Sequence, residues 1–197
     1  MSITVTYYRL PAAERENVTR DQNTWRQFER KLGKAHHAAF MSSIADMDKG
    51  GGTREEQFAR LASLMKERSD PKQFNVEKDW QSLGYLLTGK AEIGKAHVPG
   101  ETLYNVIYGG LDTGATSGYG PVQYFDDALV AESADALVKA DGHEINLRFN
   151  PTRMAQLGIY AAPEERERQA ILGVIERLAL FFQTAVTNKE NVIKFSS

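Results

Sequence analysis

Residues 178–195 read LALFFQTAVTNKENVIKF, and this stretch joins an apolar helical pattern directly to a strand pattern. Apolar residues recur every three or four positions from Ile171 to Phe182. This spacing predicts an amphipathic helix that starts at Pro163 and is the longest in the chain. NVIKF, residues 191–195, is rich in β-branched and aromatic side chains and predicts a strand. Because helices and strands do not alternate as repeated βαβ units, the predicted fold class is α+β.

Start and stop signals divide the rest of the chain into shorter elements. Thr53 followed by Glu56 is a capping box, Gly89 is a helix-ending glycine, and Asn150 before Pro151 opens a helix. The other predicted elements are a strand over Ile3–Leu10, helices over about 24–47, 53–69 and 74–89, a loop over 90–101, a buried strand over Thr102–Tyr108, and a helix from 126 or 127 to 138.

The length of the chain predicts one domain. A chain of 197 residues is long enough for one well-buried core. We therefore predict a single compact domain over residues 1–197, in which a small mixed or antiparallel sheet packs with several helices.

The composition excludes several classes of site. The chain has no cysteine, so disulfides, thiolate zinc sites and cysteine nucleophiles are excluded. The net charge is -2, and no basic stripe is dense enough to displace counterions from nucleic-acid phosphates. The opening residues, MSITVTYYRL, lack the basic start and apolar run of a signal peptide, and no apolar stretch is read as long enough to cross a bilayer. We expect a cytoplasmic protein with neither a nucleic-acid nor a membrane partner.

A glycine-rich segment, GGLDTGATSGYGPVQYF (residues 109–125), carries five glycines in its first twelve residues. Gln123 occupies the third glycine position of a dinucleotide fingerprint, and Ala115 stands where a P-loop needs lysine. Residues 96–138 contain six acidic side chains and no lysine or arginine, so the local field disfavours an anion. The segment is therefore predicted to be a structural or recognition turn and not a phosphate site.

Other motif-like stretches fail at the residues that carry the chemistry. GYLLTGKA (84–91) has the GxxxxGK spacing, but Ala91 replaces the hydroxyl residue that would bind magnesium. The stretch 46–57 ends in glutamine where a calcium loop needs glutamate, and no HExxH is present. We predict no metal site, no cofactor and no established catalytic residue. Asp112 is the one candidate acid or base, although aspartate in a glycine-rich turn usually caps a backbone N–H group.

Two functional hypotheses follow from the aromatic side chains. Aromatic residues on segments with few charges suit protein contact or a small-molecule cleft. The leading hypothesis is a non-enzymatic protein-binding module, of which an immunity or antitoxin-like protein is one version, that uses the acidic, tyrosine-bearing glycine-rich loop. The alternative is a small-molecule-binding protein or hydrolase-type enzyme. Its cleft would form around Trp80, Asp112, Tyr119 and Tyr124.

Four stretches carry a family resemblance and occur in the family's order. They are DWQSLGYLLTG (79–89), SGYGPVQYF (117–125), RFNPTRMAQLGIY (148–160) and the stretch 178–195 quoted above. Together with the N-terminal TYYRL, they make the chain resemble the YfbM-like family of small bacterial proteins, a domain of unknown function. The resemblance implies a compact α+β fold and a cytoplasmic bacterial protein, but no particular activity.

The resemblance also marks two departures in this chain. Residues from about 30 to 75 are expanded by an extra helix pair, which predicts a helical insertion. Gln81 stands where relatives often show a histidine after the tryptophan, so the resemblance leaves this position without a general base. Trp80, Gln81, Tyr119 and Tyr124 are the predicted ligand- or partner-binding residues. The oligomeric state stays open.

Overall fold

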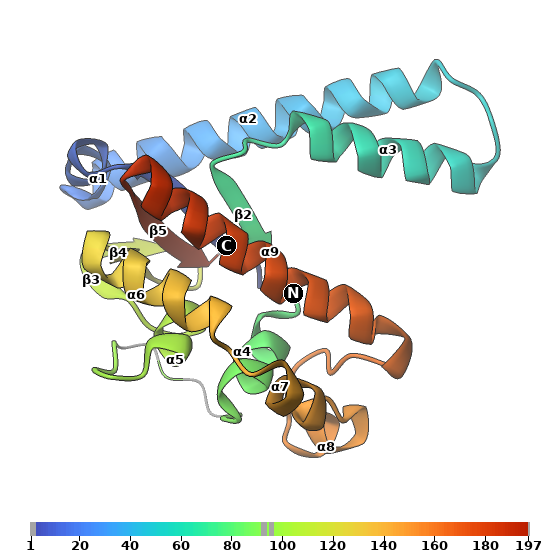
Figure 1. Ribbon diagram of the computed structural model, residues 1–197. Helices are drawn as coiled ribbons and strands as arrows, with labels where there is room; N and C mark the ends of the chain where they lie inside the picture. The colour runs from blue at the N-terminus through green and yellow to red at the C-terminus, as the bar shows by residue number, and fades with distance from the viewer. Residues whose placement is uncertain (1–2, 92–93, 95–96, 197) are drawn as a thin grey trace.

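An antiparallel sheet of five strands lies at the centre of the computed structural model, which describes residues 3–91, 94 and 97–196 (Figure 1). The strand order is β2-β1-β5-β4-β3, and each neighbouring pair is antiparallel. The last of the five strands in the sequence, β5, is therefore the central one. The strands are β1 (Val5–Pro11), β2 (Gln73–Val76), β3 (Leu111–Ser117), β4 (Gly120–Phe125) and β5 (Glu190–Ser196).

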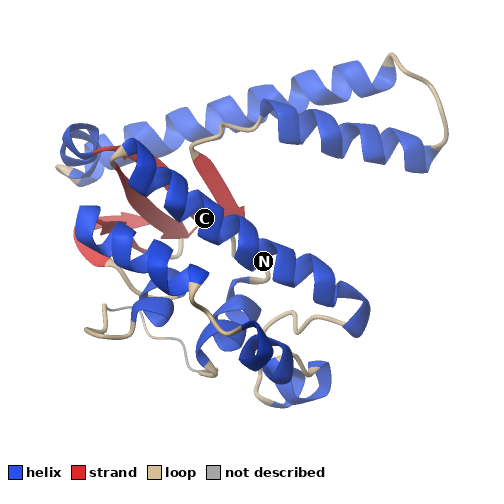
Figure 2. Ribbon diagram, in the orientation of Figure 1, coloured by secondary structure: helices blue, strands red, loops and turns tan. Residues whose placement is uncertain are grey.

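Helices cover both faces of the sheet (Figure 2). Side chains of a strand alternate between the two faces, and β5 follows this rule. Val192 packs in the larger core cluster with α9, whereas Ile193 and Phe195 pack in a second cluster around Trp25 of α2.

The helices are α1 (Ala12–Thr19), α2 (Gln22–Asp48), α3 (Arg54–Arg68), α4 (Trp80–Thr88), α5 (Thr102–Ile107), α6 (Asp127–Val138), α7 (Gly142–Arg148), α8 (Pro151–Gln156) and α9 (Arg168–Asn188), which follows a 3-10 turn, η1 (Glu165–Glu167).

The helices α2 and α3 form an antiparallel arm that projects beyond the sheet (Figure 1). The predicted capping box is present, because the Glu56 backbone N–H donates to the Thr53 hydroxyl and the Thr53 N–H donates to the Glu56 carboxylate. The Arg68 guanidinium donates across the arm to the Asp46 carboxylate and, at 2.7 Å, to the Ser42 hydroxyl. The arm overlaps residues 30–75, and their status as an insertion relative to the family stays a prediction.

The α+β class predicted from the sequence is confirmed, as are the terminal strands and most helices. Gly89 ends α4 in the left-handed conformation, with φ of 72°. Asn150 caps α8 through a bond from the Arg153 backbone N–H, with Pro151 in the first turn. Asp126 caps α6 in the same way, by accepting from the N–H of Leu129. Capping chemistry was therefore the most reliable local signal in this chain.

The segment 102–108, predicted to be a buried strand, is instead the helix α5. The side chain of Asn105 accepts from the Val98 backbone N–H at 2.8 Å and donates to the Val98 carbonyl at 2.7 Å. Tyr104 and Tyr108 are four residues apart and stack with ring centroids 5.1 Å apart, as neighbours on one helical face do. A short apolar run does not distinguish a buried strand from a buried helix, and tertiary contacts decided the outcome here.

Three other predicted features are also corrected. Residues 73–76 form the edge strand β2, which pairs with β1, and the helix that was predicted to start at residue 74 begins at Trp80. The glycine-rich segment is a hairpin of β3 and β4 and not one extended turn. α2, with 27 residues, is longer than α9, with 21. Strand β2 was missed because its pairing partner, β1, is distant in the sequence.

One helix meets the length and composition of a membrane span. Among the described residues, 165–188 is the stretch long and apolar enough to cross a bilayer, which corrects the expectation that no such stretch exists. In this fold α9 lies across the sheet (Figure 1), and its inward side chains, including Ile171, Leu178 and Phe182, are buried in the core. This packing is that of a core helix.

We predict opposite effects of alanine at two helical glycines. In α4, a Cβ atom on Gly84 would lie 2.0 Å from the Tyr108 hydroxyl oxygen, whereas in α2 nothing lies within 4 Å of a Cβ atom on Gly33. Gly84→Ala therefore overpacks α4 against α5 and should lower the free energy of unfolding by about 1–3 kcal/mol. Gly33→Ala should raise it by about 0.5–1 kcal/mol, because alanine favours the helix. Urea unfolding monitored by circular dichroism measures both, and a Gly84→Ala protein as stable as Gly33→Ala would contradict the packing described.

Candidate functional site

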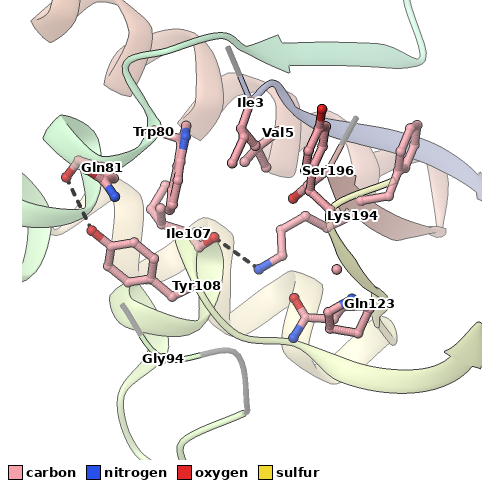
Figure 3. Close-up of a pocket in the computed structure, with 14 residues that line it drawn as sticks. Ile3, Val5, Trp80, Gln81, Gly94, Ile107, Tyr108, Gln123, Lys194 and Ser196 are labelled. Atoms are coloured by element: carbon pink, nitrogen blue, oxygen red, sulfur yellow. Dashed lines mark hydrogen bonds between the residues drawn. The ribbon is translucent and has the colours of Figure 1, made fainter. Parts of the chain in front are cut away.

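A pocket of about 350 Å³ opens at the end of the sheet where β4 and β5 meet the start of α4 and the end of α5 (Figure 3). Most of its lining is apolar or aromatic, with a few polar side chains among them. Sites for small molecules have this character. The lining residues are Ile3, Val5, Trp80, Gln81, Gly94, Ile107, Tyr108, Tyr119, Gly120, Pro121, Gln123, Lys194, Phe195 and Ser196.

Two aromatic rings form one wall of the pocket. The rings of Trp80 and Tyr108 meet edge to face, with centroids 6.0 Å apart and an interplanar angle of 76°. The Tyr108 hydroxyl donates to the Gln81 backbone carbonyl at 3.2 Å (Figure 3). Tyr108 reaches this carbonyl because Gly84 has no side chain in its path. Burial raises the pKa of Tyr108, so its phenol remains a neutral donor at physiological pH.

A buried lysine lies at the base of the pocket. Lys194 of β5 is only 4% exposed, and its Nζ donates to the backbone carbonyls of Asn105 at 3.3 Å, Ile107 at 3.1 Å and Gly109. These carbonyls lie at the C-terminal end of α5, where a positive charge is favoured by the helix dipole. No carboxylate in the described part of the chain forms an ion pair with Lys194. Burial lowers the pKa of the Lys194 amine well below its ordinary value.

Amide side chains lie next to this lysine and next to the aromatic wall. Gln123 of β4 is buried and is the direct cross-strand partner of Lys194 in the β4–β5 register. Figure 3 shows the two side chains together on the pocket side of the sheet. Gln81 follows Trp80 in α4, and its side-chain oxygen accepts from the backbone N–H of Tyr160 at 2.6 Å. The pocket thus combines one cation, two amides and aromatic rings.

The structure brings together some of the residues predicted from the sequence. Trp80, Gln81 and Tyr119 all line the pocket. Tyr119 lies in the turn between β3 and β4, with 41% of its surface exposed, and its backbone N–H donates to the Ser196 carbonyl at 3.4 Å. Its ring is therefore at the rim. That these residues bind a ligand or partner stays a prediction.

The cleft expected around Trp80, Asp112, Tyr119 and Tyr124 is not assembled. Asp112 is exposed in β3 and accepts from the Gly114 backbone N–H at 2.8 Å, which is the local capping role of a turn aspartate. Tyr124 packs in the cluster on the opposite face of the sheet, with the Arg15 guanidinium 4.6 Å from its ring centroid. Adjacent strand positions point to opposite faces, so Tyr124 is directed away from the pocket that Gln123 lines.

The six acidic residues of 96–138 are distributed over several elements, and most have partners within the chain. Glu101 pairs with Lys90, and Asp135 pairs with Lys139 at 2.7 Å. Beyond the roles already given for Asp112 and Asp126, Asp127 accepts from the side-chain amide of Asn191 at 2.6 Å. Glu101 and Asp135 thus have cationic partners within the chain, whereas Asp112, Asp126 and Asp127 accept from neutral N–H donors, which do not neutralise a carboxylate.

Sequence reasoning missed Lys194 as a site residue, and this changes the electrostatics of the glycine-rich segment. That segment has no cation of its own, yet β5 places the Lys194 ammonium against the carbonyl of Gly109. The expectation that the local field disfavours an anion counted only residues 96–138, and the structure adds this one buried lysine to the groups around the segment. The sequence contained a signal for the inward orientation of Lys194. A lysine two positions after the inward-facing Val192 occupies the same face of the strand.

Among its described residues, the polar side chains of the pocket are the Lys194 amine, the amides of Gln81 and Gln123, and the hydroxyls of Tyr108, Tyr119 and Ser196. Its described lining contains no carboxylate and no imidazole. The three hydrogen-bond donors of the Lys194 ammonium are directed to three carbonyls, which hold it in place. No group of three or more potential metal ligands occurs among the described residues.

We predict that Lys194 makes the stability of the protein depend on alkaline pH. Its folded-state pKa is lowered, so between that pKa and the unfolded value of about 10.4 the unfolded chain binds more protons. The cost of burying the charge is fully present below the folded pKa and is relieved as pH rises. The unfolding free energy of the wild type minus that of Lys194→Met should therefore increase from pH 7 to pH 10. Urea titrations across this range test the prediction, and a constant or falling difference would contradict it.

Comparison with known proteins agrees with the fold and the segments described. Residues 1–195 match the domain of unknown function DUF1877. The structure is similar to the crystal structure of a protein of unknown function, YfbM from Escherichia coli, with a TM-score of 0.58, 15% sequence identity, and coverage of 97% of this chain and 98% of that chain. At this identity the likeness shows the fold alone. The comparison with curated proteins found no match. The YfbM-like resemblance is thus confirmed, and the chain belongs to the DUF1877 family, a domain of unknown function.

Proposed function

We propose that this chain is a non-enzymatic binding protein for a small organic molecule, which enters the pocket beside Trp80 and Lys194. The single observation that carries the proposal is the pocket itself. Its volume of about 350 Å³ is within the usual range for ligand sites. Apolar side chains supply most of its surface, and Gln81, Gln123 and Lys194 are among its polar lining residues. Such a combination gives affinity through burial and orientation through hydrogen bonds.

The protein-binding role expected from the sequence remains a second hypothesis, including its immunity or antitoxin-like version. The observation that favours it is Tyr119, an exposed aromatic side chain at the rim of the pocket. Against it stand the ion pairs of Glu101 and Asp135 with lysines of the same chain, which reduce the charge available to a basic partner. A Tyr119→Ala variant separates the two roles, because a rim residue contributes more to a protein contact than to a ligand held at Lys194.

Trp80 provides a direct reporter of pocket occupancy. The chain has two tryptophans, and Trp25 is fully buried in the cluster on the other face of the sheet. In a Trp25→Phe background, tryptophan fluorescence therefore arises from the pocket wall alone. A metabolite library should contain compounds that change this fluorescence and also raise the melting temperature. A ligand at 100 times its dissociation constant should add about 2.7 kcal/mol of stability.

Variants at Ser196 provide the matched control. Ser196 lines the pocket at the end of β5 and is partly exposed, on the same side of the strand as Lys194. Ser196→Phe should fill the pocket and abolish the fluorescence change, whereas Ser196→Ala should leave it intact. If no compound alters Trp80 emission, or if Ser196→Phe binds as well as Ser196→Ala, the pocket is not a ligand site.

A further inference from the structure

We propose that the ligand of this pocket is an organic anion, a carboxylate attached to a flat apolar body, with its charge beside Lys194. This inference rests on the proposed function of the pocket and adds the chemical class of its ligand. Three features support the anionic ligand: the charge of Lys194, the shape of the pocket wall, and the arrangement of the backbone carbonyls around the Lys194 amine.

Lys194 lacks an acidic partner among the described residues. A buried charge destabilises the folded protein unless an opposite charge is paired with it, and its transfer out of water remains unfavourable even after the protein relaxes around it. Lys194 is buried, and among the described residues it has carbonyl dipoles around it but no carboxylate partner. A bound carboxylate would complete the ion pair in a site of low polarity, where charge–charge attraction is stronger than in water. A bound carboxylate would also favour the charged form of Lys194, which burial alone disfavours, and would supply the negative member of the ion pair.

The second argument is geometric. Lys194 extends along the floor of the pocket towards Ile107, and Gln123 lies beside it (Figure 3). A carboxylate placed there would lie next to an ammonium and a primary amide, both of which can donate to it. The longest of the three lysine bonds, 3.3 Å to the Asn105 carbonyl, is the one that a ligand oxygen would replace at least cost. The remaining bonds would keep the ammonium in position.

The third argument concerns the rest of the ligand. The edge-to-face rings of Trp80 and Tyr108, together with Ile107 and Val5, form an apolar surface suited to a flat body. Lys194 is the one cation in the described lining of the pocket, and one positive charge does not neutralise a doubly charged phosphate. A single negative charge therefore fits this site better than a phosphate, and the glycine-rich hairpin is not needed as a phosphate cradle.

The experiment compares two probes of nearly the same size and shape, 3-phenylpropionate and 3-phenylpropanamide, which differ in one group, a charged carboxylate against a neutral amide. Calorimetric titration of the wild-type protein at pH 7 should give an affinity for the acid at least about tenfold higher than for the amide, as expected for a hydrogen bond to a charged group. In Lys194→Met, the acid should lose this advantage while the amide binds as in the wild type. Retained amide binding shows that the variant pocket is folded.

The outcomes separate this inference from the proposal on which it rests. Equal affinity for the two probes, or tighter binding of the amide, overturns the anionic ligand and leaves a pocket for neutral molecules. An acid preference that persists in Lys194→Met overturns the role of Lys194. If Lys194→Met does not fold, the wild-type comparison of acid and amide still decides the sign of the ligand's charge. Failure of both probes overturns the inference, and failure of the wider library on Trp80 fluorescence also overturns the proposed function.

Discussion

The structure depends on the burial of β5 from both sides. This strand pairs with β1 on one edge and β4 on the other, so every backbone group in its middle is hydrogen-bonded within the sheet. One face must be covered by α9 and the other by α2, because Val192 is directed to the first and Ile193 and Phe195 to the second. The two layers of helices follow from this single strand. An antiparallel sheet that is covered on both faces has no solvated side.

The burial of β5 on both faces also determines where the pocket forms. A two-sided strand has no position for a polar side chain that water can reach, yet Lys194 occupies the inner face. Its charge is tolerated because the short helix α5 ends directly opposite and carbonyls of its last turn accept from the ammonium. α5 itself is anchored by the Asn105 side chain, which bonds to both backbone groups of Val98. The lysine, the end of the helix and the strand therefore form one unit, and the cavity lies where this unit meets the start of α4.

The sequence predicted the features that depend on neighbouring residues. Caps at Thr53, Asp126 and Asn150, and the glycine that ends α4, were each evident because the chemistry of a helix terminus lies within a few positions. Trp80 and Tyr119 were selected for their aromatic character, and both line the pocket. The identity of α5 and the strand β2 were not evident, because each was decided by contacts with distant segments. Lys194 was missed for the same reason, since its pairing with Gln123 is set by sheet register and not by spacing.

The position of β5 in the chain also affects how the protein is made. β1 begins at Val5, and its register pairs that residue with Ser196. During synthesis the N-terminal strand can pair with β2 early, and the α2–α3 arm needs only local contacts, but one edge of β1 has no partner until β5, residues 190–196, has been synthesised. Contacts between residues so far apart in the sequence form slowly, because the chain loses conformational entropy in closing the loop before the new contacts offset that loss. The contacts of the arm are therefore available before those of the whole sheet, and the pocket cannot form until β5 supplies Lys194 and Ser196.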